Sequence, residues 1–246
     1  MNEVWNLDPI YRGFEDPAFE ADMQNLRRLA QQYNAFATEL REMDSLTGLK
    51  QSIAWQEELT AQAMKLFDYA QLRQSVNTRD NQAGSYIGQI MQILSTTAGA
   101  EAAWKAWVAQ QPGVMDLVAK DEDLKDYVFY MGNLLKGSIH LLGAKGEEIA
   151  AKLTMSGGNA WSEMHGYLTS TVPVSYDGKT INLSAVRNLA YDAEPAVRKA
   201  AYEAEIACYD RIKDAVAFAL NSIKLETISD CQLRGYASPL DRTLEH

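Results

Sequence analysis

The stretch from Tyr191 to Pro239 constrains the fold most, because its sequence predicts one very long helix. Asp192 caps the start, and Pro195 in the first turn lacks an N–H group that would otherwise go unpaired. No helix-breaking residue follows before Gly235. A helix from Ala193 to about Cys231 would extend on the order of 55 Å. A helix of that length must cross more than one packing environment.

The middle of this predicted helix is apolar on every side. Ala215 to Leu220 carries no polar residue, whereas the first half of the stretch keeps its apolar residues on one stripe. A segment that is apolar all round is stable in water only where other elements cover it. We therefore expect partner elements over this region, and self-association of the chain where those partners are missing. The stripe of the first half consists of Val197, Ala201, Ala204, Cys208 and Ile212.

Helical spacing of apolar residues also recurs between Asp16 and about residue 168. Long helices joined by short connectors form antiparallel neighbours in a bundle, so we expect a mainly α fold. Before the first helix, an extended segment is anchored by Trp5, Leu7, Ile10, Tyr11 and Phe14. The expected helices run from Asp16 to about Met43, Ser45 to about Val76, about Asp80 to Ala109, Asp121 to about Leu142, Glu147 to Met155 and Ala160 to about Leu168.

One stretch has the alternation of strands rather than the spacing of helices. Residues 172–183 form two β-branched arms around Asp177-Gly178. A two-residue Asp-Gly turn is typical of a β-hairpin, because glycine takes the positive φ that the favoured turn demands. A hairpin alone is marginally stable in water. We therefore expect this small hairpin to lie on a helical surface or on further strands.

The composition narrows the class of protein and its partners. The chain is 47% hydrophobic and 23% charged, which favours a globular protein over a disordered one. A net charge of -10 argues against a nucleic-acid partner. No stretch reaches the roughly 18 uninterrupted apolar residues that span a bilayer, and the first residues lack a signal-peptide pattern. We therefore expect no membrane partner and a cytoplasmic location.

The two cysteines, Cys208 and Cys231, are too few for a disulfide framework. On one straight helix they would lie roughly 35 Å apart, which is too far for a disulfide bond. We expect reduced thiols.

Few residues suggest chemistry. Ser156-Gly157-Gly158 has the small residues of an anion cradle, but it lacks the spacing and the preceding strand of a phosphate-binding loop. A helix C-cap and turn is the simpler interpretation. His140 and His165 have carboxylates nearby in the sequence without the Glu-x-x-His spacing of a bundle metal site. We expect ordinary hydrogen-bonded histidines, and no catalytic, cofactor-binding or metal-binding residue in this chain.

Six stretches of the chain have distinctive sequences: Trp5 to Tyr11, Leu142 to Glu148, Gly158 to Trp161, Val197 to Tyr202, Ala217 to Ile223 and Arg234 to Asp241. In this order they resemble oligoendopeptidase F, a branch of the thimet-oligopeptidase-like zinc metallopeptidases. The resemblance runs over almost the whole length of the chain. It implies a zinc metalloendopeptidase whose enclosed channel admits short, unfolded peptides.

The resemblance does not include an active site. Members of that family bind zinc through His-Glu-x-x-His on one helix and a downstream glutamate, because residues four apart share a helix face. This sequence has only His140, His165 and His246, and no two are four apart. We therefore expect the N-terminal, non-catalytic portion of such an enzyme, forming part of the channel wall against the rest of the catalytic domain. The parent enzyme would bind zinc, and this chain would bind none.

The resemblance also predicts the domain organisation. We expect an N-terminal helical domain over residues 1–156 and the start of the peptidase domain over residues 157–246, with the zinc-binding helix beyond. The alternative is a free-standing helical scaffold or interaction protein without enzymatic activity. The closing Leu244-Glu245-His246 is either native or the remnant of an expression tag, and the sequence is compatible with both.

Overall fold

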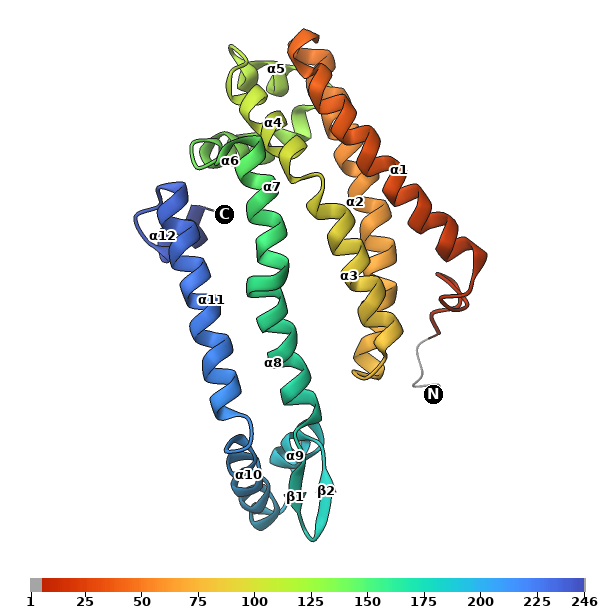
Figure 1. Ribbon diagram of the computed structural model, residues 1–246, viewed down its shortest axis with the longest axis vertical. Helices are drawn as coiled ribbons and strands as arrows, with labels where there is room; N and C mark the ends of the chain where they lie inside the picture. Colours follow the sequence, from red (N-terminus) through yellow and green to blue (C-terminus); the bar gives the residue numbers. More distant parts are fainter. Residues whose placement is uncertain (1–5, 246) are drawn as a thin grey trace. The chain divides into compact units, whose positions relative to one another are not determined.

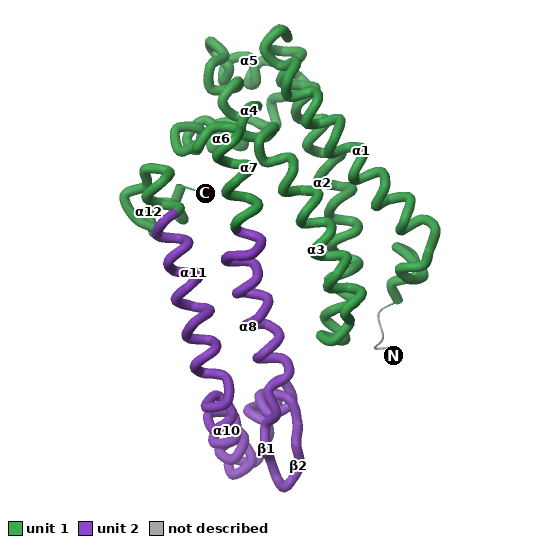
Figure 2. Tube along the Cα trace, in the orientation of Figure 1, with its two compact units in different colours: residues 1–153, 230–246 green, residues 154–229 purple. Residues whose placement is uncertain are grey.

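The structure is a computed structural model that describes residues 6–245. The expectations for Trp5 and His246 lie outside the described residues. The chain divides into two compact units, of which unit 1 holds residues 1–153 and 230–246 and unit 2 holds residues 154–229 (Figure 2). The chain passes from one unit to the other twice, each time within a helix.

Unit 1 is built from helices, with the long α1, α2 and α3 packed against one another (Figure 1). Asp16 caps α1 by accepting a hydrogen bond from the N–H of Ala18 at 3.0 Å, and Asp44 caps α2 through the N–H of Thr47. The helices of this unit are α1 (Pro17–Glu39), α2 (Ser45–Val76), α3 (Asn81–Ser95), α4 (Ala98–Ala109), α5 (Val114–Lys120), α6 (Val128–Ser138), most of α7 (Gly143–Thr154), the end of α11 (Lys213–Arg234) and α12 (Pro239–Glu245).

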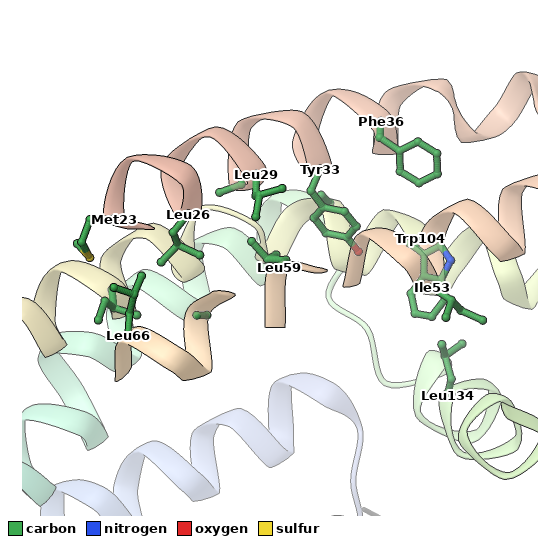
Figure 3. Packing of buried hydrophobic residues seen from close by; sticks show 14 of the residues in the cluster. Met23, Leu26, Leu29, Tyr33, Phe36, Ile53, Leu59, Leu66, Trp104 and Leu134 are labelled. Carbon is green, nitrogen blue, oxygen red and sulfur yellow. The ribbon is translucent and has the colours of Figure 1, made fainter. Parts of the chain in front are cut away.

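The core of unit 1 lies between α1 and its neighbours. Buried residues recur every three or four positions along α1 and face Leu59 and Leu66 of α2 (Figure 3). The segment before α1 is held by Tyr11 and Phe14, whose rings pack edge-on against Phe19. These two anchors are confirmed, because both side chains are buried. The buried positions of α1 are Phe19, Met23, Leu26, Leu29, Ala30, Tyr33 and Phe36.

Two of the predicted helices in unit 1 were wrong in extent. The helix predicted from about Asp80 to Ala109 is broken between α3 and α4, where the hydroxyls of Thr96 and Thr97 donate to the carbonyls of Ile93 and Leu94 at 2.6 and 2.8 Å. Such bonds compete with the helical backbone pattern. The helix predicted from Asp121 begins only at Val128, because Asp121 bonds the N–H of Asp123 in a turn.

Unit 2 combines short helices with the small sheet. A second hydrophobic core of Val172, Val174, Leu183, Val186, Ala201, Cys208 and Ile212 holds it together. Its elements are α8 (Ala160–Thr171), β1 (Val174–Tyr176), β2 (Lys179–Ile181), α9 (Leu183–Asn188), α10 (Pro195–Tyr209) and the first part of α11.

The predicted hairpin is confirmed. β1 and β2 are antiparallel, with Val174 opposite Ile181 and Tyr176 opposite Lys179. Asp177 and Gly178 both have positive φ, 47° and 70°, as a type I′ turn requires. Val174 is fully buried and β1 packs against α10, so a helix supplies the surface that the hairpin needs.

The single long helix predicted from Ala193 to about Cys231 was wrong. The chain breaks at residues 210–212 into α10 and α11. At the break, the N–H groups of Arg211 and Ile212 bond the carbonyls three residues earlier, which ends the helical pattern without glycine or proline. Ile212 is buried with Cys208 in the core of unit 2. Positions 208 and 212 would share one face of a continuous helix as well, so their common burial is compatible with both arrangements. The break removes the basis of the predicted cysteine separation.

The mainly α fold with one small hairpin is confirmed. Within residues 6–245, no helix combines the length and the apolar character that crossing a membrane requires. Both cysteines are free and buried.

Candidate functional site

A nearly buried ion pair joins two stretches of unit 1 that are far apart in the sequence. Glu147 lies in α7, and Arg234 is the last residue of α11. The guanidinium of Arg234 donates to both carboxylate oxygens of Glu147, at 2.5 and 2.9 Å. Their side chains are only 15% and 14% exposed. Such a bidentate pair fixes orientation as well as distance.

Arg234 also bonds the groups around this pair. Its Nε donates to Asp230 at 2.7 Å, and its Nη1 donates to the backbone carbonyl of His140 at 3.3 Å. Arg242 of α12 forms an ion pair with the other oxygen of Asp230 at 3.1 Å. The bond with Glu147 raises the pKa of Arg234 above its usual value. Burial raises the pKa of Glu147, but the bonds from Arg234 outweigh it and the net pKa lies below the usual value.

His140 lies beside this network with both ring nitrogens engaged. Nδ1 is 2.8 Å from the backbone oxygen of Arg234, and Nε2 is 3.2 Å from a carboxylate oxygen of Glu245 in α12. The imidazole stacks on the ring of Tyr236, with centroids 3.7 Å apart and an interplanar angle of 17°. His140 is thus an ordinary hydrogen-bonded histidine in the sense predicted, but its contacts span 94 residues of sequence.

A cavity of about 380 Å³ opens beside His140, and we call it the His140 cavity. This volume falls within the range of small-molecule sites. Leu134 and Gly137 of α6 contribute its apolar part, and charged groups of both signs surround the rest. The lining residues are Glu101, Lys105, Tyr130, Asn133, Leu134, Gly137, His140, Leu141, Glu147, Arg234, Tyr236, Arg242 and Glu245.

The glycine pair considered as an anion cradle lies in unit 2, at a bend between α7 and α8. Gly157 has non-helical φ and ψ of -91° and -117°. The carboxylate of Glu226 in α11 accepts the N–H of Gly158 and, at 2.7 Å, the hydroxyl of Thr154. A Cβ at Gly157 would overlap the Oε2 of Glu226. The bend does hold an anion, but that anion is the chain's own carboxylate. Because Gly157 leaves the helical region, one helix ends close to the predicted position, and α8 begins directly after the bend.

The described residues do not fit a zinc ion. Within residues 6–245, no group of three or more His, Cys, Asp or Glu side chains is arranged to hold a metal. A catalytic zinc requires about three protein ligands. His165 lies exposed on α8. We therefore derive no step through a metal in this chain.

The apolar stretch of α11 is largely uncovered. Ala219 is buried, but Phe218 is 70% exposed and Leu220 is 49% exposed. Leu225 and Ile228 continue the exposed apolar surface along the same helix. An exposed patch of this kind is typical of an interaction surface.

The sequence interpretation missed the cluster around Arg234. Glu147 and Arg234 both lie in stretches that carried the family resemblance, Leu142 to Glu148 and Arg234 to Asp241. The opposite charges of Glu147 and Arg234, each within such a stretch, were a signal that the two residues could form an ion pair. Nothing in the spacing of His140 indicated that it would lie between them.

Comparison with known proteins agrees with the resemblance seen in the sequence. Residues 100–172 match the family model described as oligopeptidase F. The fold is similar to that of oligoendopeptidase-F from Enterococcus faecium, with 16% identity, a TM-score of 0.76, and coverage of 92% of this chain and 46% of that protein. A candidate peptidase from Chlamydophila abortus is also similar, with 16% identity, a TM-score of 0.51, and coverage of 98% and 41%.

The chain therefore spans less than half the length of these two solved structures. No curated protein matches the sequence significantly. The resemblance to oligoendopeptidase F is confirmed by the family model and by the fold.

Proposed function

We propose that this chain is the N-terminal, non-catalytic portion of a zinc-dependent oligoendopeptidase, and that its helices form part of the wall of the substrate channel. The observation that carries the proposal is the match of residues 100–172 to the oligopeptidase F family model. The likeness of fold over 92% of the chain supports it. The division into a helical domain over residues 1–156 and the start of the peptidase domain from residue 157 is part of the same proposal.

The chemistry would reside in the rest of the parent protein. Hydrolysis of a peptide bond by zinc needs a metal-activated water and an open coordination position. Residues 6–245 hold no cluster of metal-binding side chains that could supply these. The partners of this chain are then short peptides, which the parent enzyme cleaves, and the remainder of its catalytic domain. Neither nucleic acid nor a membrane is among the proposed partners, and the proposed location is the cytoplasm.

The exposed apolar surface of α11 is consistent with this assignment. Phe218, Leu220, Leu225 and Ile228 lie uncovered on one helix. Burying apolar surface contributes roughly 25 cal/mol per Å², so covering a few hundred Å² would be worth several kcal/mol. In the parent protein we assign this cover to the catalytic portion. When this chain is alone in solution, a second copy of the chain is the partner available to cover the apolar surface of α11.

Two measurements test the proposed function. The source gene is expected to encode His-Glu-x-x-His in the same reading frame beyond Arg242. The chain alone is expected to bind no stoichiometric zinc and to leave a quenched fluorescent peptide intact. A stop codon directly after this region in the natural gene would favour the free-standing scaffold instead. One tightly held zinc per chain, or cleavage that a chelator abolishes, would show that the active site is in this portion.

A further inference from the structure

The two units have separate hydrophobic cores. The buried core of unit 1 is drawn from residues 11–134, and that of unit 2 from residues 172–212. Each cluster lies entirely within its own unit. Regions with a core of their own can open separately from the rest of a protein. The segments that lie between the two cores along the chain must therefore be stabilised by other contacts.

The stretches of unit 2 outside its core have almost no buried apolar side chains. Within the described residues 154–171 no side chain is buried, and within residues 213–229 only Ala219 is buried. These stretches contain α8 and most of α11, which approach each other at the bend (Figure 2). Two helices with so little buried apolar surface gain little free energy from packing on each other. Polar contacts then contribute a large part of what holds them together.

Glu226 provides such a polar contact. Its carboxylate oxygens accept the hydroxyl of Thr154 at 2.7 Å and the N–H of Gly158, which is 68 positions away in the sequence. Thr154 is the first residue of unit 2, and Glu226 lies close to its last residue, Ser229. One carboxylate thus joins the two ends of unit 2.

The bend fits a carboxylate and leaves no room for side chains at its own glycines. A Cβ at Gly157 would overlap Oε2 of Glu226, and a Cβ at Gly158 would lie 3.1 Å from the same atom. The hydroxyl of Thr154 and the N–H of Gly158 are donors, whereas an ionised carboxylate only accepts. The bend therefore offers charge-assisted hydrogen bonds to a carboxylate.

We propose that Glu226 is a conformational latch. With its carboxylate in the bend, α8 and residues 213–229 of α11 are held together. When the carboxylate leaves, these two helices separate and fray while both cores stay folded, because a helix of 12 residues such as α8 is marginally stable in water on its own. The bend recognises the carboxylate group, so a small free carboxylate takes its place when the side chain of Glu226 is removed.

The test is native-state hydrogen exchange of the full chain, measured by mass spectrometry. We expect Glu226→Ala to speed exchange of the amides in residues 154–171 and 213–229 by about tenfold to hundredfold, because hydrogen bonds to a charged group are lost. The amides of α1 to α3 and of α10 are expected to keep their exchange rates. Thr154→Val removes one of the two donors and is expected to have a smaller effect in the same residues. Glu163→Gln removes an exposed carboxylate from α8 and is expected to change nothing.

A rescue experiment tests the chemical class of the ligand. In Glu226→Ala, sodium formate at about 0.1 M is expected to slow exchange of the affected amides about threefold relative to sodium chloride at the same concentration. In Glu226→Gln the side-chain amide still fills the bend, so formate is expected to have no effect. Thermal unfolding of each variant shows whether it still folds. Thr154→Val keeps the latch proposal testable even if Glu226→Ala fails to fold.

Three outcomes would overturn the proposal. Unchanged exchange of residues 154–171 in Glu226→Ala would show that this carboxylate does not hold the two helices together. Equal acceleration in α1 to α3 would show that the chain opens only as a whole. Formate that slows exchange in neither variant, or equally in both, would show that the bend is not a carboxylate site. Each outcome is independent of the reading frame and the zinc content that test the proposed function.

Discussion

The bend between α7 and α8 allows a specific prediction, because the carboxylate of Glu226 occupies the space that a side chain at position 157 would need. In Gly157→Ala, the new Cβ would overlap Oε2 of Glu226, so the carboxylate must withdraw. It then loses the hydrogen bond from the hydroxyl of Thr154, which is 2.7 Å long, and the one from the N–H of Gly158. Hydrogen bonds to a charged group contribute about 1.5–3 kcal/mol each. Because the site is partly exposed, we expect Gly157→Ala to lower the free energy of unfolding by about 2–4 kcal/mol.

A double-mutant cycle separates this contact from any cost of the backbone itself. Glu226→Ala removes the same two bonds, so we expect it to cost about 2 kcal/mol on its own. With the Glu226 carboxylate already absent, the Cβ that Gly157→Ala introduces no longer meets it. The double variant is therefore expected to be about as stable as Glu226→Ala alone, which gives a coupling energy of about 2–4 kcal/mol, equal to the cost of Gly157→Ala in the unsubstituted chain.

Denaturant unfolding followed by circular dichroism gives these free energies, and hydrogen exchange of the α8 amides shows whether the loss is local. Gly166→Ala is the matched control, because Gly166 lies within α8 and an added Cβ there meets nothing within 4 Å. It is expected to stabilise the helix by up to about 1 kcal/mol. If Gly157→Ala costs the same with and without Glu226, the cost belongs to the backbone and the role assigned to Glu226 is wrong.

Three further predictions concern the pair, the hairpin and the apolar surface. Glu147→Gln should cost about 3 kcal/mol at neutral pH because it breaks a nearly buried pair. Since the pKa of Glu147 is lowered in the folded state, the stabilisation that its carboxylate provides fades as the pH falls through that pKa. Chemical denaturation at several pH values should therefore show the free energies of unfolding of the variant and the unsubstituted chain converging in acid. Gly178→Val should lower the melting temperature, at a cost of about 1 kcal/mol or more, because φ is +70° at this position; an unchanged melting temperature would contradict the turn. In light scattering, Phe218→Asp should weaken self-association of the chain, whereas Gln71→Glu, which adds the same charge at an exposed position of α2, should not. A strictly monomeric unsubstituted chain with exchange-protected α11 amides would show that the chain covers this surface itself.

Local sequence signals predicted the elements well where the decisive contacts were also local. Asp16 and Asp44 cap helices within three residues of themselves, and Asp177-Gly178 sets its own turn. The break between α10 and α11 could not be predicted in this way. Residues 210–212 contain neither glycine nor proline, so no local helix-breaking signal marks the end of α10. The helical spacing of apolar residues continues from Cys208 to Ile212 across a position where the helix itself ends.

The candidate site could not be predicted from the sequence, because its contacts join residues that are far apart along the chain. Arg234 meets Glu147 across 87 residues and His140 across 94, and no spacing rule relates positions so far apart. What the sequence did contain was the distinctive character of the two stretches that meet there. A buried arginine needs a carboxylate partner, because an unpaired charge away from water costs several kcal/mol. Arg234 lies in a distinctive stretch without the spacing of a catalytic motif. A charged residue in such a stretch is thus best interpreted as one partner of a long-range ion pair, and the other partner is to be sought in another distinctive stretch.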